Sequence, residues 1–437
     1  AAAPAAAPRL EALDAPRWLA SAMIVCFHFY HPAQRQPYSL GSFARCGGLW
    51  TQFFFVLSGF VLAYVEMARP SRKPVKVSQL QYLRRRLVTI YPTYLFVLVL
   101  TLCTMSGRSW FEWSVLPLHV LLMQAWLPIT VEDPLHHHSY QCAGQTWVTV
   151  AWFMSALVVY WLMLRPLARA FRRLSLPAVL ALLPGLWAVS LLPGWAWQYR
   201  VQRICPLSLP GYGAACNATL WCAIKNNPVG YVHVFVAGVA GARLFVLTCV
   251  RDAAVGGPPT ERTERVALDP RRAPLVLRFG VVLGYGLYGL VVAFVPTGRW
   301  YMMWHNGGLL PVMLLVLLGG ALGEDPIAKY VFQCRAFIIL GRISYAQYLG
   351  QYLVHRLLLR YVKDRGLVQL LFPFALVAAA YLTERFVTRV YTEWQRARQE
   401  RGEQGCDERC LARADRWLDR AGRRLCRGER PGGGGAA

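Results

Sequence analysis

The chain has little charge for its length. Of its 437 residues only 16% are Asp, Glu, Lys or Arg, whereas soluble domains have about 25%. Acidic residues are the scarcer kind, at 22 against 47 Lys and Arg. A chain with so little charge and a mean hydropathy of +0.34 is not a soluble enzyme, a nucleic-acid-binding domain, a fibrous repeat or a disulfide mini-protein.

Long apolar runs are present instead. Hydrophobic residues make up 56% of the chain and include 16 Trp, 20 Phe and 21 Tyr. A helix needs about 20 mostly apolar residues to cross a bilayer, and many runs here approach that length. The sequence therefore predicts an all-α, polytopic membrane bundle, with no shift in composition that marks a second folded domain.

The Lys and Arg residues that give the net charge of +25 lie between the apolar runs. Their distribution predicts the orientation of the chain in the membrane and does not indicate a nucleic-acid partner. Lys and Arg gather in 69–86, 165–173 and 251–278, so the positive-inside rule places these links in the cytosol. Few occur in 31–48, 128–147, 197–228 and 297–306, which are predicted to lie outside.

Alternation of these sides gives about ten crossings, with both termini in the cytosol. The predicted spans are 17–31, 49–67, 87–105, 148–164, 177–195, 229–250, 276–296, 307–322, 344–361 and 367–388. The short apolar stretch 114–127 is interpreted as an interfacial or re-entrant helix. A membrane domain over 17–390 would then follow a low-complexity tail, 1–16, and precede a charged cytosolic tail, 391–437, that lies near anionic lipid.

Five cysteines fall on the predicted outer loops, where an oxidising compartment would permit disulfides. They are Cys46, Cys142, Cys205, Cys216 and Cys222. Their pairing does not follow from the sequence. Asn217 begins an N-glycosylation sequon on the same side, and use of the site is left open.

Arg17 and His28 are the ionisable pair of the first span. They are eleven residues apart, so on a helix they share one face about 16 Å apart. An imidazole near the middle of the membrane could take a proton from a hydroxyl and return it to a leaving group. The alternative is a histidine held by a neighbouring helix and an arginine that only ends the span.

Five blocks of the chain, in order, resemble those of the acyltransferase-3 family, from about residue 9 to 390. They are RLEALDAPRWLASAMIVCFHF, FFFVLSGFVLAY, YLRRRLVTIYPTYL, AWFMSALVVYWLMLRPL and LGRISYAQYLGQYLV. These family members are membrane-embedded enzymes that use acyl-CoA to modify sugars and other hydroxyl compounds. The resemblance implies ten helices, a catalytic pair at His28 and Arg17, and a basic block at Arg84, Arg85 and Arg86.

Guanidinium groups at the cytosolic end suit the phosphates of coenzyme A, because they form bidentate hydrogen bonds. The alternative for the Arg84 to Arg86 run is topology alone. Trp152 and Ser155 begin a span from the outer side and could touch an acceptor sugar, although Trp152 could equally be an interfacial anchor. Ser58 and Gly59 are interpreted as a close helix contact.

Departures from the family pattern remove three ionisable groups. Many relatives have Arg where this chain has Thr89, Glu where it has Leu157, and His where it has Gln351. His355, one turn after Gln351, could face the same cavity. Ser344 and Gln347 fit the spacing of an N-terminal capping box.

The sequence as a whole predicts a membrane acyltransferase with acyl-CoA as cosubstrate and a carbohydrate or lipid acceptor. His28 would deprotonate the acceptor hydroxyl. No bound cofactor or metal is expected, and the run His136 to His138 is interpreted as a solvated loop. The alternatives are a multi-span transporter and a degenerate family member that only binds acyl-CoA or lipid, which the three lost groups favour.

Overall fold

The structure is a computed structural model that describes residues 10–30, 40–68, 78–104, 110–132, 140–197, 199, 212–254, 264–294 and 301–400. Its helices are α1 (Asp14–Phe29), α2 (Leu40–Arg45), α3 (Thr51–Met67), α4 (Gln79–Thr104), α5 (Trp110–Val120), α6 (Trp152–Phe171), α7 (Leu176–Ala196), α9 (Tyr212–Lys225), α10 (Val232–Cys249), α11 (Leu275–Arg278), α12 (Gly280–Phe294), α13 (Tyr301–Met303), α14 (Leu310–Leu322), α15 (Arg335–Tyr361), α16 (Arg365–Thr383) and α17 (Val390–Glu400).

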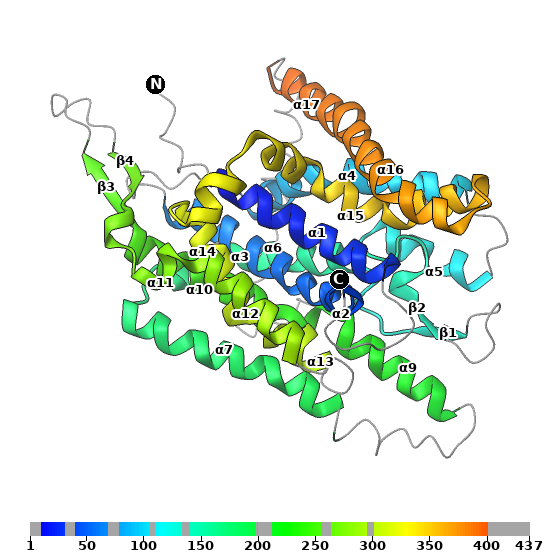
Figure 1. The fold of residues 1–437 in the computed structure, drawn as a ribbon, viewed down its shortest axis with the longest axis horizontal. Helices are drawn as coiled ribbons and strands as arrows, with labels where there is room; N and C mark the ends of the chain where they lie inside the picture. The colour runs from blue at the N-terminus through cyan, green and yellow to red at the C-terminus, as the bar shows by residue number, and fades with distance from the viewer. Residues whose placement is uncertain are drawn as a thin grey trace, which may run out of the picture.

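Short turns of 3₁₀ or π helix and two small hairpins complete the fold (Figure 1). The turns are η1 (Glu11–Leu13), η2 (Cys46–Trp50), η3 (Ala143–Gln145), η5 (Pro228–Tyr231), η6 (Pro270–Arg272), η7 (Trp304–Gly308), η8 (Ala328–Phe332) and η9 (Glu384–Arg389). Strand β1 (Thr130–Glu132) pairs antiparallel with β2 (Tyr140–Cys142), and β3 (Val250–Ala254) with β4 (Glu264–Leu268). The predicted all-α membrane bundle is confirmed.

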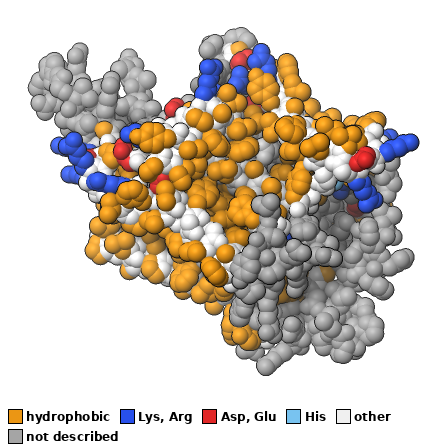
Figure 2. Space-filling model, in the orientation of Figure 1, with side chains coloured by type: hydrophobic (Ala, Val, Ile, Leu, Met, Phe, Trp, Pro, Cys, Tyr) orange, Lys and Arg blue, Asp and Glu red, His pale blue; other side chains and the backbone are white. Residues whose placement is uncertain are grey.

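Seven helical stretches within the described residues are long and apolar enough to span a membrane. They are Phe43–Met67, Gln79–Thr104, Trp152–Phe171, Leu176–Ala196, Pro228–Cys249, Tyr301–Leu322 and Arg365–Gln395. Each overlaps one of the ten predicted spans. Apolar side chains cover most of the described surface on the face seen in Figure 2, while Lys and Arg gather at its edges, as expected for a surface in contact with lipid.

The other three predicted spans correspond to helices that differ in length or charge from these seven. Helix α1 has 16 residues and α12 has 15, whereas α15 has 27 and carries four arginines. Ten crossings therefore stay a prediction. Helix α5 has 11 residues, so its length of about 16 Å is too short to span, as predicted for this stretch.

The tails and α15 differ from the sequence boundaries. Residues 11–16, predicted to be part of the N-terminal tail, form η1 and the start of α1, with Leu13 only 2% exposed. The expected C-terminal tail begins as α17, and its residues after 400 lie outside the described part, as do His136 to His138. Helix α15 starts at Arg335, so Ser344 lies inside it and the predicted capping box is wrong. Within that helix Ser344 Oγ donates to Gly341 O.

Two close helix pairs form the frame around the site. Helices α3 and α10 approach at Gly59 and Gly238, where a Cβ on either glycine would collide with a carbonyl oxygen of the opposite helix. This contact confirms the interpretation of Gly59. Helix α1 is joined to α15 by two bonds, from Ser21 Oγ to Ser344 O at 3.2 Å and from Trp18 Nε1 to Gln347 Oε1 at 2.9 Å.

A kink at η7 separates α13 from α14. The backbone leaves the helical region at Asn306, and Gly307 has φ of +122°. Three side chains from other helices donate to the carbonyl oxygens of this turn: Gln52 to Trp304 O at 2.8 Å, His233 to Asn306 O at 2.9 Å and Trp187 to Gly308 O at 3.0 Å. The freed backbone groups are thereby satisfied, as membrane depth requires.

We expect Gly307→Ala to destabilise the protein. An alanine would be strained at this φ, at a cost of about 1–3 kcal/mol, and its Cβ would lie 2.7 Å from Ser190 Oγ and 2.9 Å from His233 Nε2. The thermal midpoint of the purified variant in detergent should fall by several degrees. Gly289→Ala is the matched control, because nothing lies within 4 Å of a Cβ at Gly289. An equal thermal midpoint for both variants would contradict the expected strain at residue 307.

A disulfide ties two predicted outer loops together. Cys142 at the end of β2 is bonded to Cys222 in α9, with the two Cα atoms 5.8 Å apart. Cys216 is disulfide-bonded as well, whereas Cys46 is a free, buried thiol. The Cys142–Cys222 bond agrees with the prediction that 128–147 and 197–228 share one side. Asn217 falls within α9.

Candidate active site

The candidate site is a small cavity of about 30 Å³ that lies where several helices meet. Its lining residues come from α1, η2, α3, η3, the start of α6, α9, η7 and α15: Ile24, Phe27, His28, Gly48, Thr51, Gln145, Thr149, Val150, Trp152, Lys225, His305 and Tyr348. This volume is enough for water or a small chemical group, because a cavity needs only about 10–15 Å³ to hold one water molecule. The cavity thus accommodates the reacting groups of a substrate and not a whole substrate.

His28 is held in a defined state by Gln351. Its Nδ1 lies 2.9 Å from Gln351 Oε1, and the amide nitrogen of Gln351 donates to Tyr348 O at 2.8 Å. A backbone carbonyl only accepts, so this second bond fixes which end of the amide faces His28. The oxygen facing His28 also only accepts. The proton of the neutral ring therefore resides on Nδ1, and Nε2 carries the lone pair.

Lys225, the last residue of α9, brings a positive charge to the cavity. Its Nζ lies 5.9 Å from the ring centre of Phe27, 5.4 Å from that of Trp221 and 5.7 Å from that of Tyr301, as in cation–π contacts. Burial lowers the pKa of Lys225 from 10.5 to about 8. The amine is therefore still mainly protonated at neutral pH.

His305 and Trp152 line the cavity beside Lys225. The hydroxyl of Tyr231 donates to Lys225 O, so its oxygen accepts from Nδ1 of His305 at 2.7 Å. Trp152 is 5% exposed, and its ring centre lies 6.4 Å from that of His305. The predicted site residue Trp152 is thus placed with His28, although it is buried and does not lie at a surface.

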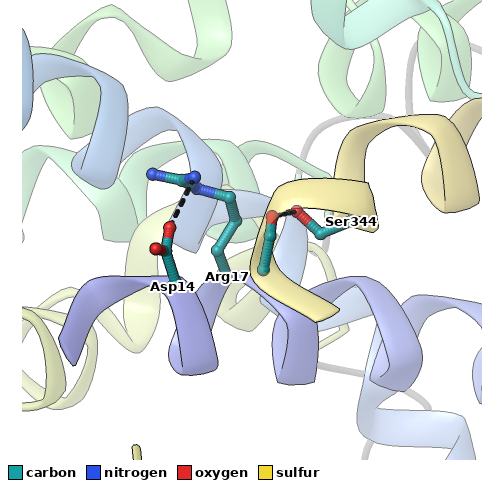
Figure 3. A network of polar contacts seen from close by, with 4 residues as sticks. Asp14, Arg17 and Ser344 are labelled. Atoms are coloured by element: carbon teal, nitrogen blue, oxygen red, sulfur yellow. Dashed lines mark hydrogen bonds and ion pairs between the residues drawn. The ribbon is translucent and has the colours of Figure 1, made fainter. Parts of the chain in front are cut away.

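Arg17 lies away from the cavity. Its Nη1 donates to Asp14 Oδ1 at 3.1 Å, within the same first turns of α1 (Figure 3). The side chain of Arg17 is one-third exposed, while that of Asp14 is mostly buried. With His28 three turns further along α1, the two residues of the predicted catalytic pair do not meet along the helix.

Arg84, Arg85 and Arg86 lie in the second turn of α4. Arg85 is exposed and the other two are half-buried. The guanidinium carbon of Arg86 lies 5.1 Å from the ring centre of Tyr82, which Arg165 approaches from α6 at 6.0 Å. Arg86 Nε is buried without a hydrogen-bond partner. Since Arg165 is thirteen residues after Trp152 on one helix, this basic cluster lies about 20 Å from the cavity.

Two other predicted residues have structural contacts instead. Ser155 is fully buried, and its Oγ accepts from Ala125 N at 3.3 Å, so it fastens the segment after α5 to α6. It does not line the cavity. His355 packs on Phe29 and Phe372, with ring centres 4.4 and 5.1 Å away, and is likewise outside the cavity.

The family model of the acyltransferase-3 domain, described as an acyltransferase domain, matches residues 10–383 of the chain. The chain belongs to the acyltransferase-3 family. It is accordingly a membrane acyltransferase, a transferase of acyl groups other than aminoacyl groups. No curated protein and no solved structure resembles it closely enough to count as a match.

Three residues that surround His28 were not predicted as site residues from the sequence. Gln351 was regarded as a lost ionisable group, yet it holds the imidazole of His28. Lys225 and His305 were absent from the expected site, because they approach His28 only through the fold. The signal that could have indicated His305 is the adjacent pair Gly307 and Gly308, which interrupts an apolar run as a kink would.

Proposed function

We propose that this acyltransferase moves an acyl group, for example acetyl, from acyl-CoA to a hydroxyl of a carbohydrate or lipid-linked acceptor. His28 acts as the general base. The observation that supports this most is the bond from His28 Nδ1 to Gln351 Oε1, because it leaves the lone pair on Nε2 of an imidazole that lines a cavity of reacting-group size.

The proposed reaction has one proton to move. The acceptor oxygen attacks the thioester carbonyl carbon as Nε2 of His28 takes its proton. The tetrahedral intermediate collapses, the C–S bond breaks, and the imidazolium returns the proton to the departing thiolate. The neutral Gln351 side chain orients the ring throughout, whereas a carboxylate there would also stabilise the imidazolium.

The donor phosphates are assigned to the basic cluster on α4. The buried, unbonded Nε of Arg86 is a donor that a phosphate oxygen can satisfy, with Arg84 and Arg85 beside it. Arg17 would add positive charge at the same predicted cytosolic end, although one of its nitrogens is engaged by Asp14. The thioester arm would extend inward from these arginines to His28.

The proposed orientation keeps both termini in the cytosol and the cavity towards the outer side. It rests on the Lys and Arg of the predicted inner links and on the Cys142–Cys222 bond, which an oxidising compartment favours. The proposal involves no metal or resident cofactor. Within the described residues no three His, Cys, Asp or Glu side chains come together to hold a metal ion.

Purified protein in vesicles with labelled acetyl-CoA and a mixed set of hydroxyl acceptors tests the function. Label that moves from coenzyme A to an acceptor supports the proposal. Label or protons that cross the vesicle without transfer would indicate a transporter. Binding of acetyl-CoA without either event would indicate a family member that has lost catalysis.

Arg86→Lys should weaken donor binding. Lysine keeps the charge but lacks Nε and the bidentate fork, and a hydrogen bond to a charged group contributes about 1.5–3 kcal/mol. The Kd for acetyl-CoA should therefore rise by about tenfold or more in equilibrium binding. Arg169→Lys is the control, since Arg169 is exposed one turn beyond Arg165. Equal donor affinity in both variants would remove Arg86 from the donor site.

A further inference from the structure

The proposed reaction requires a group that neither His28 nor the arginines on α1 and α4 supply. Attack on the thioester places a negative charge on the former carbonyl oxygen. Enzymes stabilise such an oxyanion with preorganised donors or cations, and this is usually the largest single contribution to catalysis. His28 is occupied with the proton, and Arg17 lies about 16 Å away along α1.

Lys225 is the one cation among the described residues that line the His28 cavity. None of those lining residues is Asp or Glu, and within the described part of the chain Lys225 has no ion pair. Its neighbours are the faces of Phe27, Trp221 and Tyr301, which hold a cation without neutralising it. The positive charge is therefore available to an anion that forms in the cavity.

The end of α9 that carries Lys225 is fixed at several points. Cys222, one turn earlier, is bonded to Cys142. Ile224 O accepts from Asn306 Nδ2 at 2.8 Å, and Lys225 O accepts from the hydroxyl of Tyr231. A charge held by contacts to β2, η5 and η7 needs little reorganisation when the reaction begins, which is the condition for strong electrostatic stabilisation.

We propose that the ammonium group of Lys225 stabilises the oxyanion of the tetrahedral intermediate in the His28 cavity. This inference rests on the proposed function. When the acceptor oxygen forms its bond to the carbonyl carbon, the electrons of the C=O double bond move to the oxygen beside Lys225 Nζ. They return as the C–S bond breaks, and the thiolate receives the proton that His28 took. Lys225 keeps its protons throughout.

The charge state of Lys225 gives this role a signature in pH. The titratable groups around it are His28 on α1, His305 on η7, Tyr301 on α13, Tyr348 on α15 and Tyr231 on η5, whose hydroxyl bonds the backbone oxygen of Lys225. Because burial lowers the pKa of Lys225 to about 8, a rising pH removes the ammonium charge near that value and kcat should fall. A guanidinium stays protonated to far higher pH, so Lys225→Arg should move this fall upward.

The decisive experiment measures kcat and KM of Lys225→Met and Lys225→Arg over a range of pH, with Lys329→Met, an exposed lysine in η8, as the matched control. Loss of one oxyanion donor costs about 10² to 10³ in kcat. We expect that loss of kcat in Lys225→Met for neutral and anionic acceptors alike, and near wild-type rates in Lys329→Met. In Lys225→Arg the alkaline fall in kcat should move to higher pH. This second variant tests the role even if Lys225→Met fails to fold.

An unchanged kcat in Lys225→Met would overturn the role, and so would an alkaline fall in kcat that does not move in Lys225→Arg. A defect of Lys225→Met confined to KM for anionic acceptors would also overturn it, because Lys225 would then be a contact for the acceptor. Failure of the function itself is distinguishable. If Lys225→Met remains active while His28→Ala is inactive, only this inference fails. If the wild-type protein transfers no acyl group, or His28→Ala transfers at the wild-type rate, the proposed reaction fails first.

Discussion

Replacing His28 by alanine should lower the rate of acyl transfer by about 10² to 10⁴, the usual contribution of a general base. The loss should appear in kcat, because the base acts in the transition state and contributes little to holding the acceptor. His28 contacts Gln351 and the rings of Phe27 and Tyr352. Its removal should leave the helix pair of α1 and α15 intact, since Trp18 and Ser21 join that pair elsewhere.

Transfer of labelled acetyl groups by purified His28→Ala, at equal loading and with the thermal midpoint recorded, is the measurement. His355→Asn serves as the matched control, because His355 is on the neighbouring helix but packs on Phe29 and Phe372 outside the cavity. A folded His28→Ala protein that turns over like the wild type would make His28 a packing residue. Equal losses in both variants would point to destabilisation.

Gln351→Met should reduce kcat by about 10- to 100-fold, by analogy with the loss seen when the partner that orients a metal-binding histidine is removed. Methionine has a similar shape but cannot accept the proton on His28 Nδ1, so the ring can rotate or change tautomer. Donor affinity should not change, since the basic cluster lies about 20 Å from the cavity. Gln351→Glu should retain more activity than Gln351→Met, because a carboxylate again accepts from Nδ1.

Gln347→Met provides the comparison for this effect. Gln347 is one turn earlier on α15 and accepts from Trp18 Nε1. The Gln347→Met variant therefore loses a similar bond between the same two helices, but that bond does not involve His28. If Gln351→Met and Gln347→Met lose activity equally, the bond to His28 is only a helix contact. A Gln351→Met protein with wild-type kcat would likewise contradict the orienting role.

The sequence predicted the bundle well because its signals are local. Seven predicted spans coincide with long apolar helices, since about twenty apolar residues in a row have few other uses. The start of α15 was missed for the opposite reason. The predicted span begins at residue 344, yet α15 begins at Arg335. The bonds of Ser21 and Trp18 to that helix involve partners more than three hundred residues away.

The candidate site was predicted only in part. His28 could be found because an imidazole in an apolar run is expensive and therefore conspicuous. Gln351 could not be assigned its role, because an amide shows its function only when its two ends can be followed to His28 and Tyr348 O. Lys225 lies within the predicted outer loop 197–228, and no local pattern in the sequence links it to His28. Only the fold places it on the same cavity.

The Cys142–Cys222 bond has a consequence for the biogenesis of the protein. The bond closes a segment of 80 residues that contains the whole of α6 and α7. In the predicted topology both helices must therefore be inserted, and both predicted outer loops translocated, before the two thiols can meet. Because Cys222 precedes Lys225 by a single turn, the amine should take its place only at this late step. Synthesis under reducing conditions should then give an inserted but immature enzyme, which an oxidant added after translation would activate.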